Sequence, residues 1–439
     1  MRDWLLIGVL VAVLPFAARH TWIGVLLWNW VSLMNPHRLT FGFAYVTPFA
    51  AIAAGATFLS MLISRDKLKM PWDRPVIVLL LLVLWMCITT TLAIDPSASW
   101  VSLVKTLKIQ LMVMVALAAL HSRKHIEWFV WVNILSIGYY GFKGGIFTIA
   151  TGGAGRVWGP AGSFIEDNNE LAVALVMCIP LMYFLRAVAT RAALRHFLLL
   201  LMLLCALAAL GTQSRGALLA ISAMGLLLWF RLKNRIVAGL TIAAVATALV
   251  SFMPTSWDER MSTIQTYEQD ASASARLFSW RMTINLANDR PWGGGFAIYN
   301  PEVYAKYLPE SPHTQAAHSI YFSMLGEHGY VGLGLFVLLL VLTFQQAGKM
   351  RRIARQNPET MWVHMLASMC QVSLVGYMVG GAFLSLAYFD LPYNIVVMLI
   401  VANRWMAQKG WLQEPTGPFG SAAPDAGTSA KAPTLQVSS

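Results

Sequence analysis

One imidazole and several guanidinium groups are the side chains in this chain best suited to chemistry on a phosphorylated substrate. His318 opens an apolar segment, directly after a long polar stretch. A neutral imidazole can accept a proton as a general base, and neighbouring positive charge favours that neutral form. Arginine binds phosphate through a planar fork of N–H groups. Together these residue types predict proton abstraction beside a bound phosphate or pyrophosphate.

Three arginines are the candidates for binding that anion. Arg215 lies in a short turn between two apolar segments and is followed by Gly216, which permits close approach of a ligand. Arginine beside lipid is costly and usually has a partner; the alternative for Arg215 is an anchor to lipid headgroups. Arg276 and Arg281 lie five residues apart on a predicted helix. That spacing lets the two flank one ligand, and the alternative is a solvated helix face.

Two lysines and a second histidine complete the candidate substrate-binding set. Lys105 and Lys108 interrupt an apolar segment one helical turn apart, so they share a face. Facing inward they would receive phosphate; the alternative is pairing with acidic residues on the same side. His313 precedes His318 by five residues and is the weaker candidate of the two. A lone histidine at a helix start is more often structural than catalytic.

No motif for a metal or a nucleotide cofactor is found in the sequence. The polar stretch has no HxxxH or HExxH pattern, and two histidines five residues apart make a poor ligand pair. Phosphate-loop and dinucleotide fingerprints are also absent. All four cysteines lie inside apolar segments and none forms a CxxC pair, so we expect neither disulfides nor zinc. We therefore expect no metal and no cofactor.

The composition indicates a protein embedded in a membrane. Hydrophobic residues make up 57% of the 439 residues and charged residues 12%, about half the charged fraction of a soluble globular protein. The mean hydropathy is +0.60. The net charge of +12 is spread over short loops between apolar segments, which is typical of membrane proteins. We therefore do not expect nucleic-acid binding.

Thirteen apolar segments are candidates for membrane spans, which need about 20 mostly apolar residues each. The segments are 4–18, 21–34, 45–64, 76–94, 101–120, 126–150, 170–187, 196–212, 216–230, 236–253, 318–345, 363–384 and 388–405. Because 21–34 is short for a crossing, we expect residues 1–34 to cross once. The prediction is then about twelve crossings, with both ends of the chain in the cytoplasm.

Lys and Arg cluster in every second loop, and the loops between contain few of either. Cytoplasmic loops carry this excess, so the polar loop 254–317 is expected on the outer side of the membrane. Within that loop the apolar residues of Ser272–Asn288 recur every three to four positions, which predicts an amphipathic helix on the outer membrane face. The expected domains are an N-terminal transmembrane bundle (1–253), this outer loop (254–317), C-terminal transmembrane helices (318–410) and a disordered cytoplasmic tail (411–439).

Several short motifs occur along the chain in a characteristic order. The first two are the Ser-Arg-Gly turn at 214–216 and the Arg-x-x-x-x-Arg pair of the predicted outer helix. The next two are the glycine-rich segment 290–296 and the segment Gly-Glu-His-Gly-Tyr-Val-Gly at 326–332, which follows His318. In order and topology, the chain resembles the O-antigen ligase and polymerase superfamily of bacterial membrane glycosyltransferases over about residues 1–410. Residues 34–38 and 165–170 resemble the O-glycosylation ligase subgroup. The family often has Asn after the histidine, where this chain has Ser319.

The resemblance implies an all-α, polytopic, GT-C-like protein of the bacterial inner membrane with its active site facing the periplasm. It implies transfer of a glycan from undecaprenyl pyrophosphate to a lipid A–core hydroxyl, without metal and with inversion at the anomeric carbon. His318 would be the catalytic base, and Arg215 with Arg281 or Arg276 would hold the pyrophosphate. An O-antigen polymerase or a protein O-oligosaccharyltransferase is the alternative enzyme. A lipid or solute transporter is the non-enzyme alternative, which predicts inverted repeats and broken helices at the midplane.

Overall fold

Helices make up the regular structure of the chain in the computed structural model, which describes residues 2–64, 66, 68–231, 234–255, 257, 271–312 and 314–412. Over these residues there are 15 α-helices. The helices that match the thirteen apolar segments are α1 (Arg2–Arg19), α2 (Thr21–Met34), α3 (Phe49–Ile63), α4 (Arg74–Thr91), α5 (Pro96–Ala119), α6 (Arg123–Ala150), α7 (Asn168–Val188), α8 (Ala192–Gly211), α9 (Arg215–Arg231), α10 (Arg235–Ser251), α14 (Ile320–Ala354), α15 (Met361–Gly380) and α16 (Asp390–Ala407). The predicted all-α class is confirmed.

Six of these helices are long and apolar enough to cross a membrane, by length and composition. They are α4, α5, α7, α8, α14 and α15, the last together with its flanking 3₁₀ turns η4 (Pro358–Thr360) and η5 (Gly381–Phe383). α2, α3 and α10 are shorter apolar helices. The chain is thus a multi-pass membrane protein, and the expected total of about twelve crossings stays a prediction.

Contacts between the loops sort them into two ends of the bundle. At one end Arg404 donates to the backbone oxygens of Lys69 and Leu120, joining three of the predicted cytoplasmic loops. At the other end the Asn168 side chain donates to Thr212 O at 2.7 Å, joining two of the predicted outer loops. The alternation of charge along the sequence therefore matches the grouping of the loops in space.

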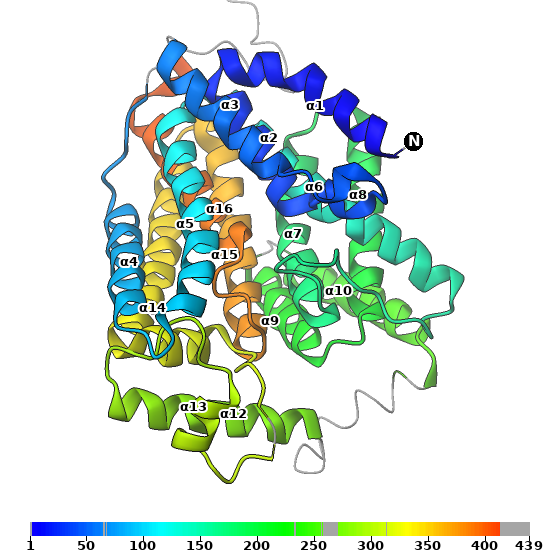
Figure 1. The fold of residues 1–439 in the computed structure, drawn as a ribbon. Helices are drawn as coiled ribbons and strands as arrows, with labels where there is room; N and C mark the ends of the chain where they lie inside the picture. The colour runs from blue at the N-terminus through cyan, green and yellow to red at the C-terminus, as the bar shows by residue number, and fades with distance from the viewer. Residues whose placement is uncertain are drawn as a thin grey trace, which may run out of the picture.

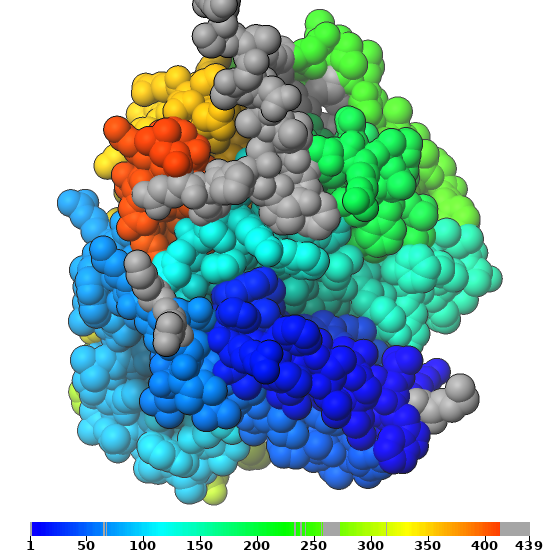
Figure 2. Space-filling model, turned by 90° about the horizontal axis from the view of Figure 1, so that it is seen from above, coloured from blue at the N-terminus to red at the C-terminus, as the bar shows by residue number. Residues whose placement is uncertain are grey.

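The first two helices run in opposite directions, and the single crossing expected of residues 1–34 stays a prediction. α1 and α2 pack as an antiparallel hairpin, in which Arg2 donates to Leu39 O at 3.3 Å and the Asp3 carboxylate accepts the Ala44 N–H at 3.2 Å. The start of α1 therefore lies beside the segment that follows α2. Pro15 inside α1 and the chain reversal at His20 interrupt the apolar stretch. Figure 1 shows α1–α3 lying obliquely across the end of the bundle that Figure 2 views from above.

The helix predicted over Ser272–Asn288 is present as α12 (Ala271–Asp289), and a short helix, α13 (Pro301–Tyr307), follows it. Both lie across the opposite end of the bundle from α1–α3 (Figure 1). Met282 and Leu286 of α12 are fully buried in a cluster with Tyr304 of α13, whereas Leu277 and Ile284 are exposed. One apolar side of the helix therefore packs against the protein, and other apolar side chains of the same helix are exposed.

A glycine-rich strap, Pro291–Gly295, joins α12 to the first part of α14. Its N–H groups at Gly294 and Gly295 donate to the carbonyls of Gly326 and Glu327, both at 2.9 Å, and Pro291 O accepts from Tyr330 N at 3.0 Å. α14 is kinked at this point, where Gly329 has φ 67° and ψ −167°. The kink leaves helical carbonyls without their usual partners within the helix, and the N–H groups of the strap bind them. Such pairing is needed because an unpaired backbone group in a membrane protein is costly. The two glycine motifs of the sequence are thus one structural unit.

His328, beside that kink, is a buried packing residue. It is fully buried, its Nδ1 lies 2.7 Å from Thr89 Oγ1 and its Nε2 lies 2.8 Å from the Tyr388 hydroxyl. The same hydroxyl donates to the Glu327 carboxylate. Since both ring nitrogens are occupied, His328 is structural. The network also ties α14 to the segment that precedes α16.

Candidate functional site

Four segments that are far apart in sequence meet at the outer-loop end of the bundle, and we call this place the His318 site. It comprises the first turn of α7, the turn Thr212–Gly216, residue Trp280 of α12, and residues Ala317–Ser319. The Trp280 indole donates to Ala317 O at 2.8 Å and stacks on Phe322, with ring centroids 4.6 Å apart. α12 thereby fixes the backbone that carries the histidine.

His318 has a strained backbone. It precedes the N-cap residue Ser319, whose hydroxyl accepts from the Phe322 N–H at 3.5 Å, and α14 begins at Ile320. Its φ is +44°, a left-handed conformation that costs a residue with a Cβ about 1–3 kcal/mol and is concentrated at functional sites. Gln213, two residues before Arg215, has φ +57°. Both turns that carry predicted substrate contacts are thus strained.

An acidic side chain that was not anticipated from the sequence lies beside the His318 ring. Its Nδ1 lies 3.8 Å from Glu170 Oε1, and the Glu170 side chain is 7% exposed while that of His318 is 36% exposed. Burial would raise the pKa of nearby Asp167, but the backbone N–H of Asn169, the Glu170 carboxyl and the charge of His318 together hold it below its usual range. Nothing in the sequence indicated this contact, because the carboxylates come from the start of a different helix, α7.

Arg215 begins α9 and is half-buried at the same end of the bundle as His318. Two contacts connect its turn to the site. Asn168, two residues before Glu170, donates to Thr212 O at 2.7 Å. A Cβ placed on Gly216 would meet Phe383 Cβ at 3.5 Å, and the Phe383 ring lies 6.3 Å from that of Trp280.

The structure separates the two arginines of α12. Arg281 extends outward to Glu310, with Nη1 3.4 Å from Oε1, and its side chain is 66% exposed. Arg276 is half-buried and stands four residues before Trp280, so it shares the face of α12 that carries this indole toward Ala317. Of the pair, only Arg276 is on the side of the helix that faces the histidine.

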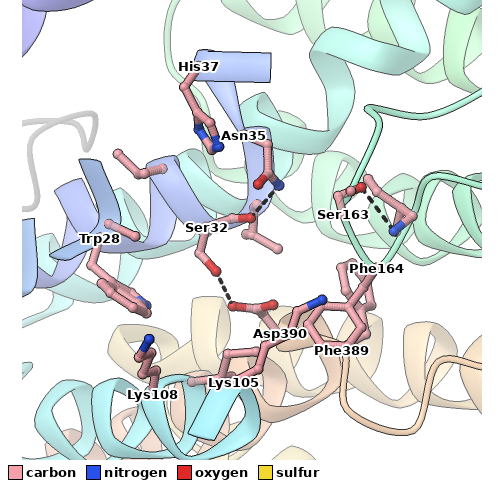
Figure 3. Close-up of a pocket in the computed structure, with 16 residues that line it drawn as sticks. Trp28, Ser32, Asn35, His37, Lys105, Lys108, Ser163, Phe164, Phe389 and Asp390 are labelled. Carbon is pink, nitrogen blue, oxygen red and sulfur yellow. Dashed lines mark hydrogen bonds between the residues drawn. The ribbon is translucent and has the colours of Figure 1, made fainter. Parts of the chain in front are cut away.

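Lys105 and Lys108 line a separate cavity, and His318 is not among its lining residues. Figure 3 shows the two lysines on α5, with Asp390 between them and α2. Asp390 accepts a hydrogen bond from the Ser32 hydroxyl at 2.6 Å, and the Lys105 ammonium lies 4.0 Å from the centre of the Phe164 ring. The cavity therefore combines two cations, one carboxylate and aromatic walls.

The remaining sequence predictions concern His313 and metal binding. His313 lies outside the described residues, as does Arg260. In the part of the chain that the structure describes, no group of three or more His, Cys, Asp or Glu side chains is placed to hold a metal ion.

Sequence reasoning gave no role to Glu170 or Trp280. Glu170 follows an Asp-Asn-Asn run that caps a predicted helix, and an acid in the first turn of a helix reads as a capping residue. Trp280 occupies an apolar position of an amphipathic pattern. In both cases the local signal indicated helix formation and concealed the long-range contact.

Two parts of the chain match known families. Residues 200–337 match the family described as O-antigen ligase, and residues 1–190 match a family of unknown function. No curated protein matches the chain. The first region contains Arg215, α12 and His318; the second contains Glu170. Residues 200–337 are therefore similar to the O-antigen ligase family, which suggests membrane glycan transfer of the ligase or polymerase type.

Proposed function

We propose that this protein is an O-antigen ligase of the bacterial inner membrane. It moves a glycan from undecaprenyl pyrophosphate to a hydroxyl of lipid A–core oligosaccharide on the periplasmic side, with His318 as general base and without a metal or cofactor. The observation that carries the proposal lies within residues 200–337: a partly exposed histidine with strained backbone, placed at the same end of the bundle as the Arg215 turn.

The proposed reaction is a one-step displacement. The acceptor O–H proton passes to Nε2 of His318, because Nδ1 faces Glu170. The acceptor oxygen forms a bond to the anomeric carbon while the bond from that carbon to the pyrophosphate oxygen breaks, and undecaprenyl pyrophosphate leaves with the electron pair. Attack opposite the leaving group inverts the anomeric centre. Proton removal by a positioned base contributes roughly 10²- to 10⁴-fold in rate.

Guanidinium groups stabilise the leaving pyrophosphate, and such charge stabilisation is usually the largest single contribution. We assign this role to Arg215 and Arg276, because Arg215 begins α9 at the same end of the bundle as His318 and Arg276 shares the face of α12 that carries Trp280. Arg281 would have to leave Glu310 to reach the donor. We therefore expect Arg281→Gln to retain more transfer than Arg276→Gln in the same membrane assay, although sequence spacing ranks the two arginines equally.

Lys105 and Lys108 are assigned to another anionic group of the donor or acceptor, bound in their own cavity beside Phe164. Their separation from His318 means that Lys105→Gln and Lys108→Gln should raise the KM of one substrate more than they lower kcat. A change confined to kcat would contradict this assignment.

The test of the function uses purified protein in lipid nanodiscs with undecaprenyl-pyrophosphate-linked glycan as donor. Three acceptors are compared side by side: lipid A–core, a second lipid-linked glycan and a pilin-like protein. Transfer to lipid A–core supports a ligase. Transfer only to the second or third acceptor makes the protein a polymerase or a protein O-oligosaccharyltransferase, and movement of donor across the bilayer without transfer supports the transporter.

Two variants test the residue roles. His318→Ala should lower transfer by about 10²-fold or more, because it removes the base. Arg215→Lys keeps the charge but loses the planar fork, and should lose most activity. Wild-type rates in His318→Ala would overturn the base assignment.

A further inference from the structure

Glu170 is a buried carboxylate with two ionisable neighbours, the Asp167 carboxyl, which also interacts with His318, and the His318 imidazole. Its side chain is 7% exposed. Oε1 accepts one backbone N–H, that of Ser385, at 3.3 Å, and Oε2 is buried without a hydrogen-bonding donor among the described residues. A buried charge needs hydrogen bonds or an opposite charge to offset its desolvation. The imidazole of His318, at 3.8 Å from Oε1, is placed to supply it.

The orientation of the ring decides what this contact does. Nδ1 is the ring nitrogen that faces the carboxylate, so a proton on Nδ1 is favoured and Nε2 is left bare as a proton acceptor. After Nε2 has accepted a proton, the ring is positively charged, and the carboxylate stabilises that form. Catalytic hydrogen bonds are often long in the absence of substrate and shorten when it binds, which is consistent with the 3.8 Å separation.

The first turn of α7 holds the carboxylate in place. Asp167 caps the helix by accepting the Asn169 N–H at 2.8 Å, and the positive end of the helix dipole favours negative charge there. Asn168 in the same turn donates to Thr212 O at 2.7 Å. One helical turn therefore contacts both the histidine and the turn that leads into Arg215.

We propose that Glu170 is a positioning residue for the transfer reaction: it fixes the tautomer and direction of the His318 ring and stabilises its protonated form. This rests on the proposed function, in which His318 is the base. It also gives a role to the N-terminal region of unknown function, because Glu170 lies within residues 1–190 and His318 within residues 200–337. The catalytic unit would then span both regions.

The experiment compares Glu170→Gln and Glu170→Asp with Glu302→Gln, a matched change at an exposed carboxylate of α13. Transfer is measured from pH 5 to 9 in nanodiscs with the lipid-linked donor and lipid A–core. We expect Glu170→Gln to lower kcat by about 10- to 10³-fold, less than His318→Ala does, because general-base catalysis as a whole contributes roughly 10² to 10⁴. Donor KM should change less than about threefold, Glu170→Asp should recover part of the rate, and Glu302→Gln should match the wild type.

The pH profile separates a positioning role from a structural one. Without the carboxylate the protonated imidazole is less stable, so the acidic limb of kcat should move to lower pH in Glu170→Gln. The double variant with His318→Ala should be no slower than His318→Ala alone. Wild-type kcat in Glu170→Gln, or a loss of kcat without a shift of the acidic limb, would overturn the role of Glu170. If His318→Ala is inactive in the same assay, the proposed function still stands. Full activity in His318→Ala would overturn both.

Discussion

Replacement of Gly329 by alanine is the most direct test of how the strap and α14 fit together. Gly329 has φ 67° and ψ −167°, a region that is essentially restricted to glycine and costs other residues of order 1–3 kcal/mol. An added Cβ would also lie 2.0 Å from Pro291 O, so the strap must move. Its three hydrogen bonds to α14 contribute about 0.5–1.5 kcal/mol each. The sum predicts a loss of about 3 to 7 kcal/mol for Gly329→Ala.

The same helix provides the control. Gly334 lies five residues further along α14, and a Cβ there would meet nothing within 4 Å. Alanine is favoured over glycine in a helix by up to about 1 kcal/mol. In thermal unfolding of the detergent-purified protein, Gly329→Ala should therefore lower the apparent Tm by several degrees, whereas Gly334→Ala should leave it unchanged or raise it. Equal Tm values for the two variants would refute the fit of the strap against the kink.

Three further predictions concern side chains around the site. Trp280→Phe removes the hydrogen bond to Ala317 O and keeps an aromatic ring. Transfer should fall by up to about fivefold for the roughly 1 kcal/mol of one hydrogen bond, and the Tm should fall only slightly in the same preparation. Tyr388→Phe leaves the buried side chains of His328 and Glu327 each without a hydrogen-bond partner, at about 1–3 kcal/mol each. It should lower the Tm more than Tyr330→Phe, which loses an exposed hydrogen bond to Asn288. A larger Tm loss in Tyr330→Phe would contradict the buried network. Asp167 has a pKa below its usual range, because burial, which would raise it, is outweighed by hydrogen bonds and the charge of His318. The ionised Asp167 carboxylate therefore stabilises the folded protein at pH values above its ordinary unfolded pKa of about 3.9, and this stabilisation is lost as the pH falls through the lower folded pKa. Asp167→Asn should lower the Tm at pH 7, and the Tm difference between variant and wild type should shrink toward about pH 3.

The helices and the sorting of the loops could be predicted from the sequence. Each of the thirteen apolar segments forms a helix, because a run of apolar residues in lipid must satisfy its backbone internally. The positions of Lys and Arg also predicted which loops lie together, since charge placement follows the side of the membrane. α12 was predicted from spacing alone. These are properties of local composition, and neighbours in sequence are enough to determine them.

The hairpin of α1 and α2 could not be predicted in the same way. Hydropathy gives the length of an apolar stretch but not the direction in which the chain continues after a short helix. The contact between Asp3 and the Ala44 N–H joins residues on either side of two helices, and only packing against α3 and α6 decides that they reverse.

The partners of the histidine likewise depended on the tertiary structure. The sequence singled out His318, since an imidazole at the mouth of a span is unusual by type and place, but it did not indicate an acidic neighbour. Packing brought Glu170 to the ring, turned Arg281 toward Glu310 and placed the two lysines in a cavity of their own. The direction of a side chain depends on the angle of its helix and on the helices that surround it. Those quantities arise from contacts between residues that lie far apart in the sequence, which no local pattern encodes.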